Sequence, residues 1–208
     1  MNTEHDPHQT LVRARTLLRS HTTGTLLCDG TPYEALYIID PSDGALVVSA
    51  ESEMFEADDC VLVIPEDRFN APIRVTLSLK EEPESGSTDR YLAYHQRQQR
   101  PRWARGKIAF AKVDSGGVAD GDALMVPNPL NASISSLCKR LNNDPKALRE
   151  VCLLLSKVKI EQPVAVGVDE EGCDVRAEFG VVRVQWPAPV PDANACEEVI
   201  ASLLGGVS

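Results

Sequence analysis

The residues best suited to bind a ligand lie in one basic segment, residues 90–112. This segment contains seven arginines and lysines and four aromatic residues, but no aspartate or glutamate. Guanidinium groups form paired hydrogen bonds with carboxylates and phosphates, and an aromatic ring can cover a planar molecule. The segment therefore predicts a site for an anionic planar small molecule. The candidate ligand-binding residues are Arg97, Arg102, Trp103, Arg105 and Lys107.

A second interpretation of the same segment is structural. Residues 51–67 are rich in acidic side chains and contain no arginine or lysine, so the two segments are also suited to pair across a barrel or a subunit interface. His95 lies within the basic segment and is the candidate metal ligand, because a neutral imidazole is a common axial ligand of haem iron. A single helical histidine is more often a surface or interface residue. Both interpretations stay open.

Motifs for catalysis are absent from the sequence. It contains no glycine-rich phosphate loop, no G-x-S-x-G nucleophile motif and no H-E-x-x-H metal motif. The six cysteines are dispersed, without a C-x-x-C pair or the spacing of a zinc site, and we interpret them as reduced packing residues. Asp169 and Asp174 flank a segment that predicts a tight turn. No residue stands out as a catalytic nucleophile, and enzymatic activity is an open question.

Charge and hydropathy exclude two classes of partner. The 208 residues include 21 basic and 31 acidic side chains, which gives a net charge of −10. Such a surface repels phosphate backbones and anionic lipid headgroups. No run of 18 apolar residues is long enough for a membrane helix. We therefore expect a cytoplasmic protein that binds neither nucleic acid nor membranes.

In the first part of the chain, the sequence pattern predicts a helix followed by the strands of a small barrel. Asp6 followed by Pro7 is a typical helix start, and the apolar spacing that follows predicts a helix over residues 6–21. Period-two alternation and turn residues predict further elements. The expected strands are 23–28, 34–39, 45–49, 61–64, 73–80 and 107–113, with a helix over 89–98. Residues 115–128 are rich in glycine and proline and predict a loop at a domain boundary.

The second part of the chain predicts a small α+β domain. Apolar residues at helical spacing predict a helix over 134–141, and Asp144-Pro145 predicts the start of another. Strands are expected over 164–168, 173–178 and 181–185, and a last helix is capped near Asp192 or Asn194. The order is ααβββα. The fold class is therefore α+β, with a split β-barrel over residues 1–126 and an ααβββα domain over residues 127–208.

Several motifs support a family resemblance. Residues 165–177, AVGVDEEGCDVRA, and 182–187, VRVQWP, are similar to the "G-x-D-x-x-G-hydrophobic-D/E-L-R … R-hydrophobic-x-F-P" hairpin of the haem-iron utilisation proteins. These proteins belong to the pyridoxamine-phosphate-oxidase-like split-barrel superfamily. In the first part of the chain, four segments are similar to elements of that family: RARTLL at 13–18, GTLL at 24–27, PY at 32–33 and RYLAYH at 90–95.

The resemblance implies a homodimer whose split barrels bind FMN or haem at the subunit interface. After the third strand the family carries an "H-x-x-N-L" segment, whereas residues 51–59 here contain five carboxylates and no histidine or asparagine. Carboxylates repel a flavin phosphate, so we expect the standard FMN site to be lost. The family's "H-M-N-x-D-H" helix start corresponds to residues 129–134, PLNASI, which lack both histidines.

These observations predict a dimeric binding protein related to the haem-utilisation proteins. Haem or another anionic tetrapyrrole is the candidate ligand, held by the basic segment, and FMN is not expected. One alternative is an FMN-dependent oxidoreductase or haem-degrading enzyme of the same superfamily with a different site. Another is a dimeric module that binds only protein.

Overall fold

The chain folds into two compact units. The structure, a computed structural model, describes residues 6–65, 71–114 and 116–206. Unit 1 comprises Met1–Pro127 and unit 2 comprises Asn128–Ser208, and each has its own hydrophobic core. Within the described residues, no helix is both long and apolar enough to cross a membrane.

Unit 1 begins with helix α1 (Pro7–Arg19). Asp6 caps it, since its side chain accepts a hydrogen bond of 2.9 Å from the backbone N–H of His8, and Pro7 occupies the first turn, where no donor is needed. The buried face of α1 presents Thr10, Ala14 and Leu18 to the core. The helix expected over residues 6–21 is confirmed.

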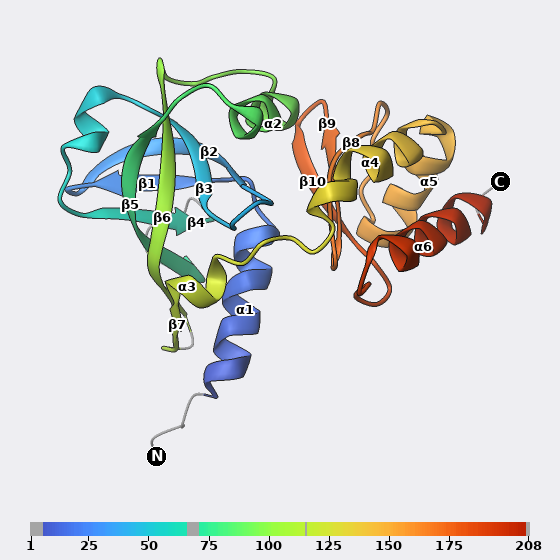
Figure 1. Cartoon of the computed structure of the whole chain (residues 1–208), viewed down its shortest axis with the longest axis horizontal. Helices are drawn as coiled ribbons and strands as arrows, with labels where there is room; N and C mark the ends of the chain where they lie inside the picture. Colours follow the sequence, from blue (N-terminus) through green and yellow to red (C-terminus); the bar gives the residue numbers. More distant parts are fainter. Residues whose placement is uncertain (1–5, 66–70, 115, 207–208) are drawn as a thin grey trace. The chain divides into compact units, whose positions relative to one another are not determined.

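Six antiparallel strands of unit 1 form a closed barrel (Figure 1). They are β1 (Thr23–Cys28), β2 (Thr31–Ile39), β3 (Leu46–Ala50), β4 (Cys60–Ile64), β5 (Ile73–Glu82) and β6 (Arg102–Val113). The strand order is β3-β2-β1-β4-β5-β6, and pairing of β3 with β6 closes the ring. Strand β7 (Val118–Asp120) pairs with the far end of β6. The expected split barrel is confirmed.

Strand β6 is longer than the sequence pattern predicts. It begins at Arg102 instead of residue 107, and the added residues 102–106 pair with β3. Their inward positions carry Ala104 and Gly106, which have little apolar side chain to reveal a strand. Space is tight at Gly106, where a Cβ would lie 3.3 Å from the Cβ of Leu46. The sequence pattern therefore does not reveal residues 102–106, the segment of β6 that closes the barrel.

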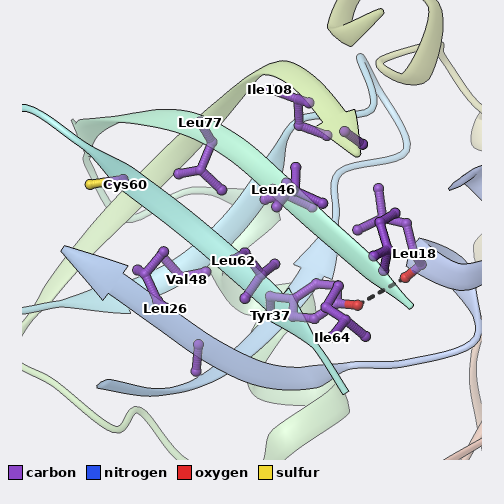
Figure 2. Packing of buried hydrophobic residues seen from close by; sticks show 14 of the residues in the cluster. Leu18, Leu26, Tyr37, Leu46, Val48, Cys60, Leu62, Ile64, Leu77 and Ile108 are labelled. Atoms are coloured by element: carbon purple, nitrogen blue, oxygen red, sulfur yellow. Dashed lines mark hydrogen bonds between the residues drawn. The ribbon is translucent and has the colours of Figure 1, made fainter. Parts of the chain in front are cut away.

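The barrel interior is filled by alternating residues of every strand (Figure 2). Leu26, Leu46, Leu62 and Ile64 are all almost completely buried. Tyr37 also points inward, and its hydroxyl donates a hydrogen bond of 2.9 Å to the carbonyl oxygen of Leu18. This bond ties the barrel to the end of α1, so the one polar atom of that ring is satisfied.

Short helices complete unit 1. They are η1 (Ser52–Phe55), α2 (Gly86–His95) and α3 (Gly121–Leu124). Helix α2 begins three residues earlier than expected because Ser85 and Thr88 cap its first turn. It ends at His95 because Gln96 adopts a left-handed conformation with φ of 58°. The segment expected to be a loop, 115–128, contains β7 and α3.

Unit 2 has the expected order ααβββα. Helices α4 (Ile134–Asn142) and α5 (Pro145–Ser156) precede strands β8 (Val164–Asp169), β9 (Gly172–Ala177) and β10 (Gly180–Gln185), and α6 (Ala193–Gly206) closes the unit. The strands form an antiparallel sheet in the order β10-β9-β8. Asp144 and Asp192 accept hydrogen bonds from the first turns of α5 and α6. The predicted fold class is confirmed.

Candidate functional site

Helix α2 covers the outer face of the barrel where β2, β3 and β6 meet. Trp103 alternates with the core residue Ala104 along β6, so its ring points outward, yet it is only 5% exposed. The rings of Trp103 and Tyr91 of α2 pack in a T-shaped arrangement, with centroids 4.9 Å apart. Tyr91 in turn lies 4.6 Å from the ring of His95. Trp103 is therefore a packing residue beneath α2 and offers little surface to a ligand.

Two hydroxyl groups in this cluster have no hydrogen-bond partner among the described residues. They belong to Ser49 of β3, the register partner of Trp103, and to Tyr91. Burial raises the pKa of the Tyr91 hydroxyl, and the nearby Ser49 hydroxyl lowers it by a smaller amount. The two hydroxyls are close but are not placed to form a hydrogen bond. The hydroxyls form a small polar spot in an otherwise apolar contact.

His95 is held by the main chain. Its Nε2 lies 3.0 Å from the carbonyl oxygen of Tyr37. Burial is the main cause that lowers the pKa of His95, so the ring is neutral at pH 7 and Nε2–H donates to that carbonyl. An iron atom could bind Nε2 only if this hydrogen bond broke. Among the described residues, no group of three or more histidine, cysteine or acidic side chains is placed to hold a metal ion.

Arg105 is surrounded by three carboxylates of the same chain. Its guanidinium makes two hydrogen bonds of 3.0 Å to Asp40, one of 2.9 Å to Asp43 and one of 3.4 Å to Glu82. Asp40 also accepts a hydrogen bond from Ser87 in the first turn of α2. Arg105 therefore joins β6, β5, the β2–β3 turn and α2, and a ligand would have to displace these partners.

The β2–β3 turn holds Asp40 and Asp43 in place. The carboxylate of Asp40 accepts hydrogen bonds from both the backbone N–H and the hydroxyl of Ser42. Gly44 follows with φ of +80°, and a Cβ there would lie 2.6 Å from the backbone nitrogen of Val126. Only glycine fits this position. The sequence pattern predicts the turn, but it does not show that the turn binds Arg105.

Arg102 and Lys107 have different surroundings from Arg105. Arg102 forms a bidentate ion pair with Glu81 of β5, and its guanidinium lies 5.0 Å from the centre of the Phe55 ring. Its Nη1 also lies 3.3 Å from the hydroxyl of Ser52. Lys107 is exposed on the outer side of β6. The five candidate ligand-binding residues thus do not share one set of neighbours.

Arg97 and Arg100, which follow α2, form the more accessible cationic surface. Arg97 lies 3.9 Å from the carboxylate of Glu34, and both side chains are more than half exposed. Arg100 donates a hydrogen bond of 2.8 Å to the carbonyl oxygen of Glu34 and lies 5.4 Å from the centre of the Tyr33 ring. We call Tyr33, Glu34, Arg97 and Arg100 the α2-end surface. Its use of β2 residues could not be predicted from the spacing of the basic segment.

In the part of the chain that the structure describes, the predicted pairing of the basic segment with the acidic residues of 51–67 is not seen. For the described residues, the acidic partners of Arg97, Arg102 and Arg105 lie on β2, on β5 and in the β2–β3 turn. The contacts of Arg102 with η1 are with Ser52 and Phe55, not with a carboxylate. Glu66 and Asp67 lie outside the described residues.

The whole chain is similar in fold to the crystal structure of the protein Atu2129, of unknown function, from Agrobacterium tumefaciens str. C58. The match covers 98% of this chain and 99% of that chain, with a TM-score of 0.69 and 19% sequence identity. A heme-binding protein from Mycobacterium smegmatis matches over 95% of this chain and 96% of that chain, with a TM-score of 0.40 and 19% identity. No family model and no curated protein matches. The chain therefore has the split-barrel fold of Atu2129, and a fold alone identifies no ligand.

Proposed function

We propose that this protein is a homodimeric split-barrel binding protein whose ligand is haem or another anionic tetrapyrrole, held by its carboxylates at the α2-end surface. The observation that carries the proposal is the guanidinium of Arg100 over the ring of Tyr33, with the exposed guanidinium of Arg97 beside the adjacent Glu34. Guanidinium forks match carboxylate geometry, and a ring can stack on a planar molecule. Arg97 has only an exposed ion pair to give up, unlike Arg105.

The residues present fit the periphery of a tetrapyrrole better than its metal. Arg97 and Arg100 supply charges for its carboxylates, whereas Nε2 of His95 is already bonded to the Tyr37 carbonyl. We therefore propose that the ligand is recognised without iron coordination. FMN fits poorly, because residues 51–59 place exposed carboxylates where a phosphate would need cationic or amide donors. We expect the protein to purify without bound flavin and to bind FMN negligibly.

A second copy of the chain is the proposed partner of the outer face of β6 and β7, where two large apolar side chains are exposed beside Lys112 and Asp120. Phe110 on β6 and Val118 on β7 are 42% and 58% exposed. Val118 is the register partner of Lys112, which lies on the same face of β6 as Phe110. Burial of these side chains between two copies would remove apolar surface from water. Sedimentation equilibrium tests this proposal, and a concentration-independent mass of 22.7 kDa at micromolar protein would contradict it.

Ligand recognition is tested by titrating the protein separately with haemin, iron-free protoporphyrin IX and FMN. Haemin and protoporphyrin are expected to bind with similar affinity, because their carboxylates are the same. The double variant Arg97→Ala/Arg100→Ala is expected to weaken both by roughly 1.5–3 kcal/mol per lost charged hydrogen bond. Its melting temperature should change little, because Arg97 loses only an exposed ion pair and Arg100 loses one surface hydrogen bond to a carbonyl oxygen.

The matched control removes two other exposed cations, Lys80 and Lys107. This variant should retain the haemin affinity of the wild-type protein, and a clear loss would move the site to β6. Haemin binding far tighter than protoporphyrin binding, with a spectrum of histidine-coordinated iron lost in His95→Ala, would overturn recognition without the metal. Tight binding of FMN and a yellow purified protein would favour the FMN-dependent oxidoreductase instead.

A further inference from the structure

Two cysteines face each other at one end of the barrel. Cys28 is the last residue of β1 and Cys60 is the first residue of β4, and they are direct partners in the antiparallel register. The neighbouring pair exchanges a backbone hydrogen bond, from Asp29 N–H to Asp59 oxygen at 2.9 Å. Because hydrogen-bonded and non-hydrogen-bonded pairs alternate, Cys28 and Cys60 occupy a non-hydrogen-bonded position, where the Cα atoms of the two strands approach most closely.

The two thiols are already in contact. The Sγ of Cys60 donates to the Sγ of Cys28 at 3.7 Å, and Figure 2 shows the Cys60 sulfur at the margin of the core. A non-hydrogen-bonded antiparallel pair has a Cα separation of about 4.5 Å, which lies within the range that a disulfide spans, about 4.4–6.8 Å. Side-chain rotation alone can therefore bring the sulfurs into bonding distance.

We propose that Cys28 and Cys60 are a reversible redox modification site that links β1 to β4 through a disulfide. The oxidant is a low-molecular-weight disulfide. A thiolate of the pair attacks one of its sulfurs, breaks its S–S bond and releases one small thiol. The second cysteine then attacks the mixed disulfide, forms the Cys28–Cys60 bond and releases the second small thiol. The protein loses two electrons and two protons, and the small disulfide gains them.

Burial makes this site slow to react but stable in either state. Cys28 and Cys60 are 5% and 3% exposed, and burial raises the pKa of Cys28 to about 12 and also raises that of Cys60. The folded pair is therefore protonated at neutral pH, and exchange needs local opening of the strand ends. The bond would close a loop that contains β2, β3 and η1, so it constrains the unfolded chain and stabilises the barrel.

The test is to refold the full-length protein from urea in a glutathione redox buffer, where burial does not limit access to the thiols. Refolding in oxidised buffer is expected to reduce the number of titratable thiols from six to four, and peptide mapping should find Cys28 joined to Cys60. The oxidised protein should melt about 5–15 °C above the reduced protein. Dithiothreitol should reverse both changes.

The control variants separate this pair from the four cysteines of unit 2. Cys28→Ala and Cys60→Ala should each abolish the rise in melting temperature, whereas Cys152→Ala, which is equally buried in unit 2, should keep it. Native protein that refolds in oxidised buffer with all six thiols free would overturn the proposal. Linkage of other cysteines in its place, or a bridge that lowers the melting temperature, would also overturn it.

Discussion

Replacing Arg105 with alanine is the sharpest test of how the basic segment is used. The side chain of Arg105 is 26% exposed, and that of its main partner, Asp40, is 5% exposed. In the variant, Asp40 keeps its hydrogen bonds from Ser42 and Ser87 but loses two charged hydrogen bonds. Glu82, which is also mostly buried, loses its cation. Two poorly solvated carboxylates are then left without a counter-charge.

The expected loss of stability lies between two known limits. An exposed ion pair is worth roughly 0.2–1 kcal/mol, and removing one partner of a fully buried pair costs about 3–5 kcal/mol. The partial exposure of Arg105 places its removal between them, and we expect the free energy of unfolding to fall by about 2–3 kcal/mol. For a unit of this size the melting temperature falls by roughly 10 °C.

The matched control is Arg102→Ala. Arg102 is the other arginine of β6, and it forms an ion pair with Glu81. The side chains of Arg102 and Glu81 are 38% and 55% exposed. Urea unfolding should show a loss below about 1 kcal/mol for this variant. Equal losses for the two variants would refute the assignment of Arg105 as the structural link. A loss of haemin affinity in Arg105→Ala at unchanged stability would refute it as well.

The effect of Arg105→Ala should depend on pH. Burial, which raises the pKa of Asp40, is outweighed by hydrogen bonds from Ser42 and Ser87 and by the charge of Arg105, so the pKa is lowered. A carboxyl group with a lowered folded pKa stabilises the fold above its unfolded pKa of about 3.9, and this contribution is lost as pH falls through the folded pKa. The difference between wild type and variant should therefore be full at pH 7 and shrink below about pH 4.

Three further variants have defined expectations. Arg183→Ala removes a buried guanidinium that pairs with Asp169 and Asp174, so urea unfolding should show a loss of about 3–5 kcal/mol. Tyr91→Phe removes a buried hydroxyl without a partner, so thermal melts should show no loss and a gain of up to about 1 kcal/mol. Burial lowers the pKa of His95. The stability that the buried neutral ring contributes is therefore present above a pH of about 6.5 and is lost as pH falls through the lowered pKa. His95→Gln should lack this part of the pH dependence, and an unchanged profile would contradict the buried neutral ring.

Much of the fold could be predicted from local patterns. Asp6-Pro7, Asp144-Pro145 and Asp192 mark helix starts because a capping carboxylate and an N1 proline act within one turn. Short apolar or alternating runs bounded by turn residues located β1 to β5 and β8 to β10. These signals need only neighbouring residues, so no knowledge of distant contacts is required.

The closure of the barrel could not be predicted in this way. Residues 102–106 carry small side chains inside and charged or aromatic ones outside, so they show no apolar alternation. Their strand conformation is imposed by pairing with β3 on one side and β5 on the other. Residues 118–124 form β7 and α3 through contacts with the preceding strand β6 and with α1, which lies far away in sequence.

By itself, the sequence determined an α+β fold, its helix starts and the position of the basic segment. The tertiary structure decided how the charges of that segment are used. Arg105 meets Asp40, 65 residues away, and Arg100 meets Glu34, 66 residues away, because strand register and turn geometry bring them together. Composition records how many charges a segment has, but a charge is neutralised by what lies beside it in space, and only the folded chain sets that distance.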